Sequence, residues 1–449
     1  MGHFVPHTEG EIAAMLGLLG LSTLDDLFEV VPEALRLSRT LALPGGMSEP
    51  DVAAEMGRLA GANTACGPDL VCFAGGGAYD HEMPAAVQAV AFRSEFVTAY
   101  TPYQAEVAQG ILQVLFEYQT LVARITGVAV ANASLYDGAT ACVEAANLAV
   151  AATGRPTVWV SRGVNPRWRA TMCTFAEGTG HATVELDLDR GHTAYPPPEE
   201  EVGEGDPGAI VVQHPNYLGC LEDLDRARAV ADRTGALLVV AFDPVAAGLL
   251  RPPGSYGADV VVGEGQPFGT PLSFGGPYLG LFACTQDHVR RLPGRLVGET
   301  VDVEGRRAYV TTLRTREQDI RRERASSNVC TNQTLIAVVC ALQLAWLGTA
   351  GLRELALRCA RATRYTREAL LAIDGVEALV DGAGPTLREF AVSLPVSADT
   401  AVERLAEVGF LAGVALGEEY GGGLLVAATE RRTRAEIDAY AGAMAKAVR

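Results

Sequence analysis

Lysine is almost absent from this chain. Of its 36 basic residues only Lys446 is a lysine, and the remainder are arginines. Arginine replaces lysine freely on solvated surfaces, so a compositional bias of the genome explains much of the skew. The bias therefore says little about any single position, but it leaves Lys446 as the sole side-chain amine.

Several other signals are missing as well. The nine cysteines are scattered, odd in number and contain no C-x-x-C pair, which predicts neither a zinc site nor a disulfide framework. A reducing cytosol fits this usage, so we expect a cytoplasmic protein. The first residues show no secretory pattern, and no 18-residue apolar run occurs, so no membrane span is expected.

Acidic residues outnumber basic ones, giving a formal net charge of −18. This balance argues against nucleic acid as the main partner, because few cations are free to neutralise phosphates. The densest basic stretch is RRERASS at residues 321–327, which is also typical of a solvated helix face. At 449 residues the chain is expected to form two or three structural units.

Short β-branched runs alternate with helical stretches through the middle of the chain. The expected strands are VAVANAS, TVWVS, AIVVQHP, LLVVAFDP, ADVVVG and YLGLFAC. The expected helices between them cover about 104–126, 138–152, a stretch after Pro166, and 221–235. This alternation predicts an α/β fold with a mostly parallel sheet covered by helices on both faces.

The expected organisation has three parts. Residues 1–85 form a helical N-terminal arm and segment, where Thr8 and Glu11 have the spacing of a capping box. Arms of this kind often embrace a neighbouring subunit. Residues 86–330 form the large α/β domain, and residues 331–449 form a connecting helix and a smaller C-terminal α+β domain.

Ligands in open α/β sheets lie where strands end and helices begin. The segment from Ser134 to Thr140, SLYDGAT, closes one strand and opens a helix at Gly138. Backbone N–H groups at a helix N-terminus can hold a phosphate, so this segment is a candidate phosphate cradle. The alternative is a plain N-cap at Asp137 with no ligand.

Two further strand ends are candidates. Asp243 ends LLVVAFDP, where a carboxylate can pair with a pyridinium nitrogen, as in pyridoxal phosphate (PLP) enzymes, or can simply form a turn. The loop GEGQPFG, residues 263–269, spaces its glycines as G-x-G-x-x-x-G. That spacing is one residue too long for the dinucleotide fingerprint, so an NAD-type enzyme is weakly supported.

The order of several long motifs resembles one family, the P-protein of the glycine cleavage system, glycine dehydrogenase (decarboxylating), and specifically the α chain (subunit 1) of its two-chain form. The motifs that carry the resemblance are FAGGGAYDHEMP, YTPYQAEVAQGILQVLFEYQTLVARITG, NASLYDGATACVEA, QHPNYLGCLED, GEGQPFGTPLSFGGP and LPGRLVGETVDVEGRRAYVTTLRTREQDIRRERASSN. The resemblance runs from PHTEGEI to the final helix and covers nearly the whole chain.

This resemblance implies a PLP-dependent transferase type I fold and an α₂β₂ assembly, with PLP bound by a lysine of the β chain (subunit 2). It implies that glycine is decarboxylated, that CO₂ is released, and that the aminomethyl group passes to the lipoyl arm of the H-protein.

By order along the chain, Gln266 stands about where the catalytic relatives have the PLP lysine. A glutamine amide cannot form a Schiff base, so no PLP is expected on this chain. The catalytic relatives stack an aromatic ring on the cofactor, whereas this chain has Asn165 at the nearest candidate position. We therefore expect a vestigial pseudo-site, made of Ser134, Gly138, Thr140, Asp243 and Gln266.

In type I PLP enzymes the active site lies at the dimer interface. Residues expected to contribute to the partner's site are Tyr100, Tyr103, Glu106, Arg324 and Asn328. A planar guanidinium such as that of Arg324 can pair bidentately with phosphate or with the carboxylate of glycine. The alternative to this supporting role is a non-catalytic scaffold or regulatory subunit that docks the H-protein.

Overall fold

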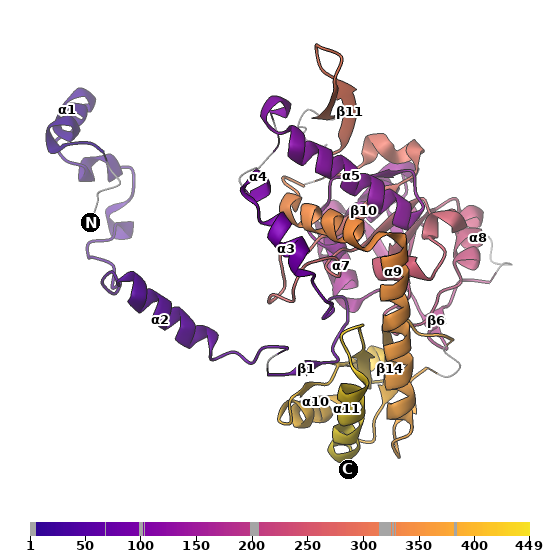
Figure 1. The fold of residues 1–449 in the computed structure, drawn as a ribbon. Coiled ribbons are helices and arrows are strands. Elements are labelled where there is room, and N and C mark those ends of the chain that lie inside the picture. The colour runs from indigo at the N-terminus through magenta and orange to yellow at the C-terminus, as the bar shows by residue number, and fades with distance from the viewer. Residues whose placement is uncertain are drawn as a thin grey trace. The chain divides into compact units, whose positions relative to one another are not determined.

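The computed structural model of the chain describes residues 6–67, 69–97, 102, 104–197, 206–313, 325, 327, 329–380 and 384–449. The chain divides into two compact units, one up to Thr64 and one from Ala65 onward. Figure 1 shows the ribbon of both units, and each is described here by itself.

The first unit consists of short helices joined by extended chain. Its elements are α1 (Glu9–Leu19), η1 (Asp25–Phe28), η2 (Glu33–Leu35) and α2 (Glu49–Ala60). The predicted capping box is confirmed, because Thr8 and Glu11 exchange their backbone and side-chain hydrogen bonds. Among the described residues of this unit only Leu16 is a buried hydrophobic residue, so the unit has almost no core of its own.

The second unit is built around a seven-stranded sheet with strand order β2-β10-β9-β8-β7-β3-β4. The strands from β9 to β4 in this order run parallel, whereas β10 runs antiparallel to β9 and to β2. The prediction of a mostly parallel sheet is therefore confirmed. The strands are β2 (Val130–Ala131), β3 (Thr157–Ser161), β4 (Ala182–Leu186), β7 (Ala209–His214), β8 (Leu237–Phe242), β9 (Val260–Glu264) and β10 (Gly280–Cys284).

Helices cover both faces of this sheet, as the near-continuous apolar strands require. The side chains of β7 alternate, with Ile210 and Val212 in the core beneath one set of helices and Val211 in the core beneath the other. The first set is α5 (Gln109–Thr126), α8 (Leu224–Thr234) and the first part of α9 (Thr334–Leu371). The second set is α6 (Gly138–Thr153) and α7 (Pro166–Thr179).

The helix α9 links this domain to the C-terminal one. It is the only helix of the described residues that is long and apolar enough to cross a membrane, a property that the sequence did not predict. Its backbone is non-helical at Gly348, and residues such as Ala337, Val338 and Leu344 lie in the core of the large domain. Its composition is therefore that of a partly buried core helix.

The C-terminal domain is smaller and has a four-stranded antiparallel sheet with strand order β13-β14-β17-β16. Residues Val71–Cys72 also belong to this region, because they form β1 and pair with β15. The elements are β13 (Glu377–Ala378), β14 (Glu389–Ser393), β15 (Phe410–Leu411), β16 (Val414–Ala415), β17 (Leu424–Ala427), α10 (Ala398–Ala406) and α11 (Arg434–Ala447).

Smaller elements complete the second unit. The strands are two antiparallel pairs, β5 (Leu188–Asp189) with β6 (His192–Thr193) and β11 (Val297–Val301) with β12 (Arg307–Thr311). The helices are α3 (Ala85–Ala91), α4 (Ser94–Val97), η3 (Ala105–Val107), η4 (Pro244–Gly248), η5 (Pro253–Tyr256), η6 (Gln286–Arg291) and η8 (Glu418–Tyr420).

Candidate functional site

The carboxyl ends of the parallel strands β7, β8 and β9 face a pocket at the N-terminal ends of α6 and α7. We call it the sheet-end pocket; the residues on which its chemistry depends are Tyr79, Asn165, Trp168, Asp243, Glu264 and Arg388. This is the place where open α/β sheets bind their ligands. The cavity measures only ≈ 40 Å³, whereas sites for small organic ligands are roughly 300–1,000 Å³.

A carboxyl group of the chain occupies the N-terminal end of α6. Glu264, the last residue of β9, accepts a hydrogen bond from the backbone N–H of Gly138 at 2.9 Å. Its other oxygen accepts the backbone N–H groups of Gln266 and Leu279, each at 2.9 Å. The N–H of Thr140 donates to Asp137, which is the N-cap of the helix. The predicted cradle at Gly138 and Thr140 is thus saturated from within the chain.

Burial has a strong effect on Glu264. The residue is 8% exposed, and desolvation raises its pKa to about 8, although the three N–H donors act in the opposite direction. A carboxyl group at a helix N-terminus is favourably placed by the helix dipole and by unpaired N–H groups. Its position is therefore explained by the local hydrogen bonding, and its high pKa by the dry surroundings.

Trp168 closes the same helix end from the side of α7. A Cβ atom added at Gly138 would lie 2.3 Å from the Trp168 ring, so only glycine fits beneath the indole. The approach of the ring explains a glycine at the first position of α6 without any ligand.

Asp243 is paired rather than free. Its Oδ1 lies 2.7 Å from Nη2 of Arg388, and it also accepts the N–H of Val245 at 2.9 Å. Arg388 directly precedes β14 and is 4% exposed. Its guanidinium carbon lies over the Tyr79 ring, 3.6 Å from the ring centroid. The positive charge opposite Asp243 is therefore supplied by the chain itself.

Gln266 is fixed in the wall of the pocket. Its side-chain oxygen accepts the N–H of Tyr79 at 2.9 Å, and its side-chain nitrogen donates to the carbonyls of Tyr79 and Thr270 at 3.0 and 2.8 Å. The residue is 1% exposed. An amide suits this place because it both donates and accepts, so Gln266 bridges the segment around Tyr79 to its own loop.

Asn165 begins α7 and caps it. Its side-chain oxygen accepts the N–H of Arg167 at 3.0 Å, and its side-chain nitrogen donates to the carbonyl of Gly76 at 2.7 Å. Both ends of the side chain are therefore engaged in holding local structure.

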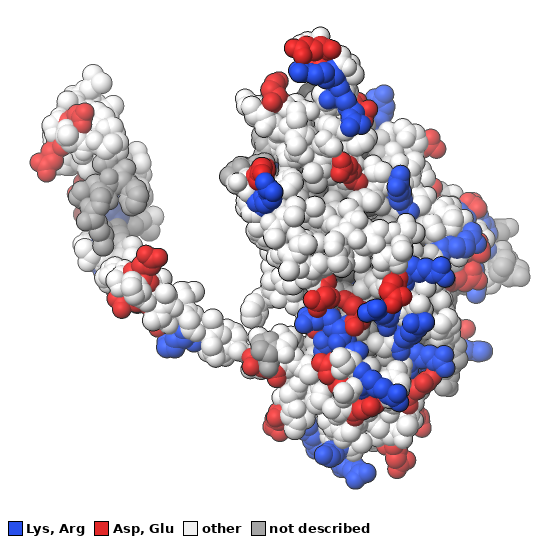
Figure 2. All heavy atoms as spheres, viewed as in Figure 1, with Lys and Arg blue, Asp and Glu red and all other residues white. Residues whose placement is uncertain are grey.

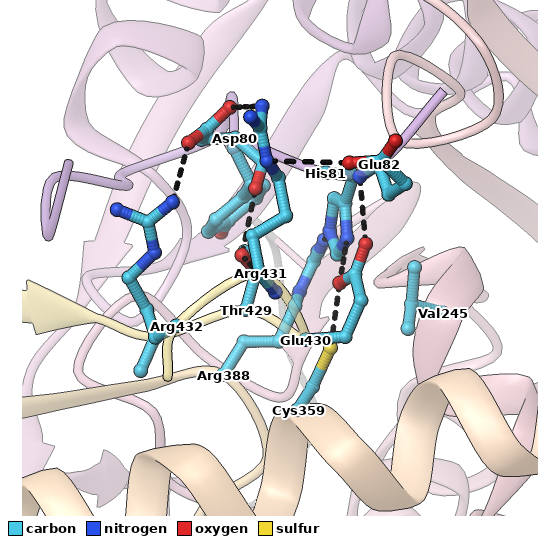
Figure 3. Close-up of polar contacts among 12 residues, drawn as sticks. Asp80, His81, Glu82, Val245, Cys359, Arg388, Thr429, Glu430, Arg431 and Arg432 are labelled. Carbon is cyan, nitrogen blue, oxygen red and sulfur yellow. Dashed lines mark hydrogen bonds and ion pairs between the residues drawn. The ribbon is translucent and has the colours of Figure 1, made fainter. Parts of the chain in front are cut away.

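A buried polar network links Arg388 through His81 to Glu430 (Figure 3). Nη1 of Arg388 lies 2.7 Å from Nε2 of His81, and Nδ1 of His81 lies 2.7 Å from Glu430. Since a guanidinium only donates, Nε2 must be the acceptor, which places the proton of a neutral imidazole on Nδ1. Burial raises the pKa of Glu430, but the hydrogen bond from His81 and the N–H of Glu82 hold it at about 2.

His81, Cys359 and Glu430 also form a compact set of potential metal ligands, with their ligand atoms within 4.8 Å of one another. A metal at this set would need the lone pair of Nδ1, which would move the ring proton to Nε2. Nε2–H would then face the N–H donor of Arg388 at 2.7 Å. The contacts therefore favour a hydrogen-bonded network over a metal site.

Comparison with known proteins gives the family. The family model described as Glycine cleavage system P-protein matches residues 2–443. The chain belongs to the glycine cleavage system P-protein family.

Individual relatives agree with this assignment. "Probable glycine dehydrogenase (decarboxylating) subunit 1" of Prosthecochloris aestuarii is 46% identical over 97% of this chain and 98% of the relative. A crystal structure of glycine decarboxylase (P-protein) in inhibitor-bound form is 45% identical, with a TM-score of 0.90, over 99% of this chain and 100% of that chain. The role of the chain is thus that of a glycine dehydrogenase (decarboxylating) subunit, and "subunit 1" implies a partner subunit.

The fold class expected from the sequence is confirmed as well. A sphingosine-1-phosphate lyase of Burkholderia pseudomallei has a TM-score of 0.61 at 16% identity, over 93% of this chain and 94% of that chain, a likeness in fold alone. The P-protein chain has the α/β PLP-dependent transferase fold, with the large sheet and the small C-terminal domain described above.

The residues of the sheet-end pocket do not fit PLP. The helix end that would hold its phosphate binds Glu264, and the carboxylate that would face its pyridinium nitrogen binds Arg388. No lysine lies in the pocket, and the cavity is smaller than the cofactor requires.

The structure brings together some of the predicted pseudo-site residues. Gly138 and Gln266 both donate backbone N–H groups to Glu264, and Asp243 lines the same pocket. Ser134 instead hydrogen-bonds Asn332 through its hydroxyl group.

The residues expected to reach the partner are placed only in part. Glu106 lies exposed in η3, ahead of α5. The other four, Tyr100, Tyr103, Arg324 and Asn328, lie outside the described residues. Sequence reasoning missed Glu264, Trp168 and Arg388; for Glu264 the available signal was a carboxyl group two residues before Gln266.

Proposed function

We propose that this P-protein subunit carries no PLP and completes or supports a site in which subunit 2 binds the cofactor. One observation carries the proposal: the chain's own Glu264 and Arg388 already pair the groups at Gly138 and Asp243 that would hold the cofactor. Gln266, the residue nearest to the expected lysine position, is buried and engaged with Tyr79 and Thr270. No amine is available there for a covalent bond to a cofactor.

The proposed reaction is the decarboxylation of glycine, with release of CO₂ and transfer of the aminomethyl group to the lipoyl arm of the H-protein. PLP supplies an electron sink for such chemistry. In the proposed α₂β₂ assembly that cofactor belongs to subunit 2. We propose a cytoplasmic location for the assembly, in keeping with the scattered cysteines.

The first unit supports an obligatory partner. Apolar side chains on it are exposed from Met15 to Leu59, including Leu18 at 89% and Val30 at 90%. So many exposed apolar side chains with almost no core beneath them favour a surface that another chain covers. Subunit 2 is the occupant that we propose.

The second unit also presents a charge-poor face. Figure 2 shows few charged side chains over α3, α5 and the first part of α9, whereas both signs of charge gather around the C-terminal domain. Exposed large apolar residues of this region are Val90, Phe92, Val107 and Trp346. Depletion of charge with retention of aromatic side chains is typical of the centre of an interface.

Five residues singled out from the sequence are candidates for the partner's site. We propose that Tyr100, Tyr103 and Glu106, which precede α5, and Arg324 and Asn328 contribute to substrate or phosphate binding in subunit 2. Replacing Tyr103 by Phe or Arg324 by Gln in the purified two-chain enzyme should lower glycine decarboxylation without dissociating the complex. Unchanged kinetics in both variants would remove this part of the proposal.

The absence of PLP on this chain is tested by spectroscopy. The chain is purified alone and together with subunit 2, and each sample is examined for the visible absorbance of lysine-bound PLP. We expect no band from the chain alone and a band from the pair. A stoichiometric band from the chain alone would defeat the proposal.

The contribution of this chain to catalysis is tested with subunit 2 alone. Its decarboxylation of glycine is measured with free lipoamide in place of the H-protein. A supporting subunit predicts little activity until this chain is added. Full activity of subunit 2 alone would instead identify this chain as a scaffold that docks the H-protein.

A further inference from the structure

The α6 helix begins in the interior of the protein, where its N–H groups need an acceptor. Gly138, its first residue, is buried, and the Trp168 ring excludes any side chain at that position. Buried helix termini without a partner are costly, because water cannot reach the N–H groups. An acceptor must therefore come from elsewhere in the chain or from a ligand.

Three N–H groups from separate parts of the chain converge on one carboxyl group. They belong to Gly138 at the start of α6, to Gln266 in the following loop, and to Leu279 at the approach to β10, and each lies 2.9 Å from an oxygen of Glu264. Such convergence of backbone N–H groups at a helix N-terminus is the usual geometry for holding a phosphate or a carboxylate ligand.

A second contact in the same pocket pairs a carboxylate of the chain with a cation of the chain. Asp243 pairs with the guanidinium of Arg388 at 2.7 Å, and Cζ of this guanidinium lies 3.6 Å from the centroid of the Tyr79 ring. The pocket thus contains an internal acceptor at its N–H cluster and an internal cation at its carboxylate. Glu264 lies 126 positions from Gly138, and Arg388 likewise lies far from Asp243 in the sequence.

From these contacts we infer that the sheet-end pocket is a site for phosphate or carboxyl oxygens that the chain fills itself, with the Glu264 carboxyl group in the place of a free ligand. The inference extends the proposed function by naming what replaces the ligand. The two fail separately, because PLP on the unaltered chain would defeat the proposed function, whereas the present inference depends on anions bound by a variant.

The test removes the internal acceptor and offers a free one. The full chain with Glu264→Ala is unfolded thermally at increasing concentrations of inorganic phosphate or formate, with sodium chloride at equal ionic strength as the reference. We expect the variant to unfold several degrees below the unaltered chain and to recover saturably with phosphate and formate. The unaltered chain should show only the effect of sodium chloride.

Glu222→Ala is a matched control. Glu222 is also buried, and its carboxyl group accepts hydrogen bonds from the backbone N–H of Thr193 and from the side-chain amide of Asn216. It does not accept a helix N-terminal N–H in the described contacts. Its removal should lower the unfolding temperature without saturable recovery by phosphate or formate. Equal responses of the two variants, or no saturable recovery of Glu264→Ala, would overturn the inference.

If Glu264→Ala does not fold, Glu264→Gln provides the second test. Its amide oxygen can still accept from Gln266 and Leu279, but its NH₂ group faces the N–H of Gly138. Amide hydrogen exchange should therefore become about tenfold faster at Gly138, with Leu279 as the internal reference. Unchanged exchange at Gly138 would show that the helix end does not need this acceptor and would overturn the inference.

Discussion

Nη2 of Arg388 lies 2.7 Å from Oδ1 of Asp243, and this ion pair is buried between the large sheet and the C-terminal domain. Asp243 follows β8, whereas Arg388 precedes β14, so the pair joins the two domains of the second unit. The same guanidinium donates to His81. One side chain therefore connects the sheet-end pocket to the network around Glu430.

Replacing Arg388 by Met should destabilise the chain strongly. The change leaves Asp243 without its cation and His81 without its donor, and breaking one half of a buried pair costs roughly 3–5 kcal/mol. The measurement is the free energy of unfolding in urea.

Arg358→Met is the control for this prediction. Arg358 makes an exposed pair with Glu354 and its loss should matter little. The double variant Arg388→Met with Asp243→Asn should recover part of the lost stability, because no unpaired charge then remains in the interior. If Arg388→Met were as stable as Arg358→Met, the buried pair would not hold the domains together.

The stability of the chain should depend on pH through Glu264. Its folded pKa is raised from 4.5 to about 8, so between these values the folded state keeps a proton that the unfolded state has lost. The contribution is fully present below pH 4.5 and is lost as the pH rises to about 8, at up to about 1.4 kcal/mol per pH unit.

The comparison that isolates this effect is Glu264→Gln, which cannot titrate. Urea unfolding is measured from about pH 4 to about pH 9, an interval that contains the whole shift. The variant should show a flatter profile than the unaltered chain over this interval. Parallel profiles would mean that the folded and unfolded pKa values of Glu264 do not differ.

Much of the fold could be predicted from local patterns. The alternation of β-branched runs with helices predicts the parallel sheet, and the spacing of Thr8 and Glu11 predicts a capping box that the structure contains. Asp137 caps α6, which was the ligand-free interpretation of its segment. These features depend on residues a few positions apart, so a single sequence carries the information.

The contents of the pocket depend on contacts that a single sequence does not show. Glu264 meets Gly138 across 126 positions, and its place two residues before Gln266 does not reveal that its side chain turns to the start of α6. Arg388 likewise reaches Asp243 from another domain. The sequence could place an empty cradle at Gly138, but not the side chain that fills it.

Replacing Gly138 by Ala should destabilise the chain, because the new Cβ would lie 2.3 Å from Trp168. Overpacking of this kind costs roughly 1–3 kcal/mol, measured as the free energy of unfolding. Combining it with Trp168→Leu should recover part of the loss by making room. Gly110→Ala, in α5, is the control: an added Cβ there meets nothing within 4 Å, so stability should be unchanged or slightly higher.

The apolar stripe of α2 should be required for assembly. Val52, Met56 and Leu59 are 45%, 58% and 46% exposed, and their spacing places them on one face of the helix. Changing Met56 and Leu59 to Glu puts charge into the surface that subunit 2 is proposed to cover, and should greatly weaken the complex on size-exclusion chromatography.

A matched double variant separates this effect from a general loss of the helix. Glu55→Gln with Arg58→Gln removes an exposed salt bridge of α2 and spares the apolar stripe. It should leave assembly with subunit 2 intact, because an exposed pair contributes little and the apolar side chains remain. If the charged stripe still assembled normally, the first unit would have to be covered by something other than subunit 2, since its apolar residues have almost no core of their own to enter.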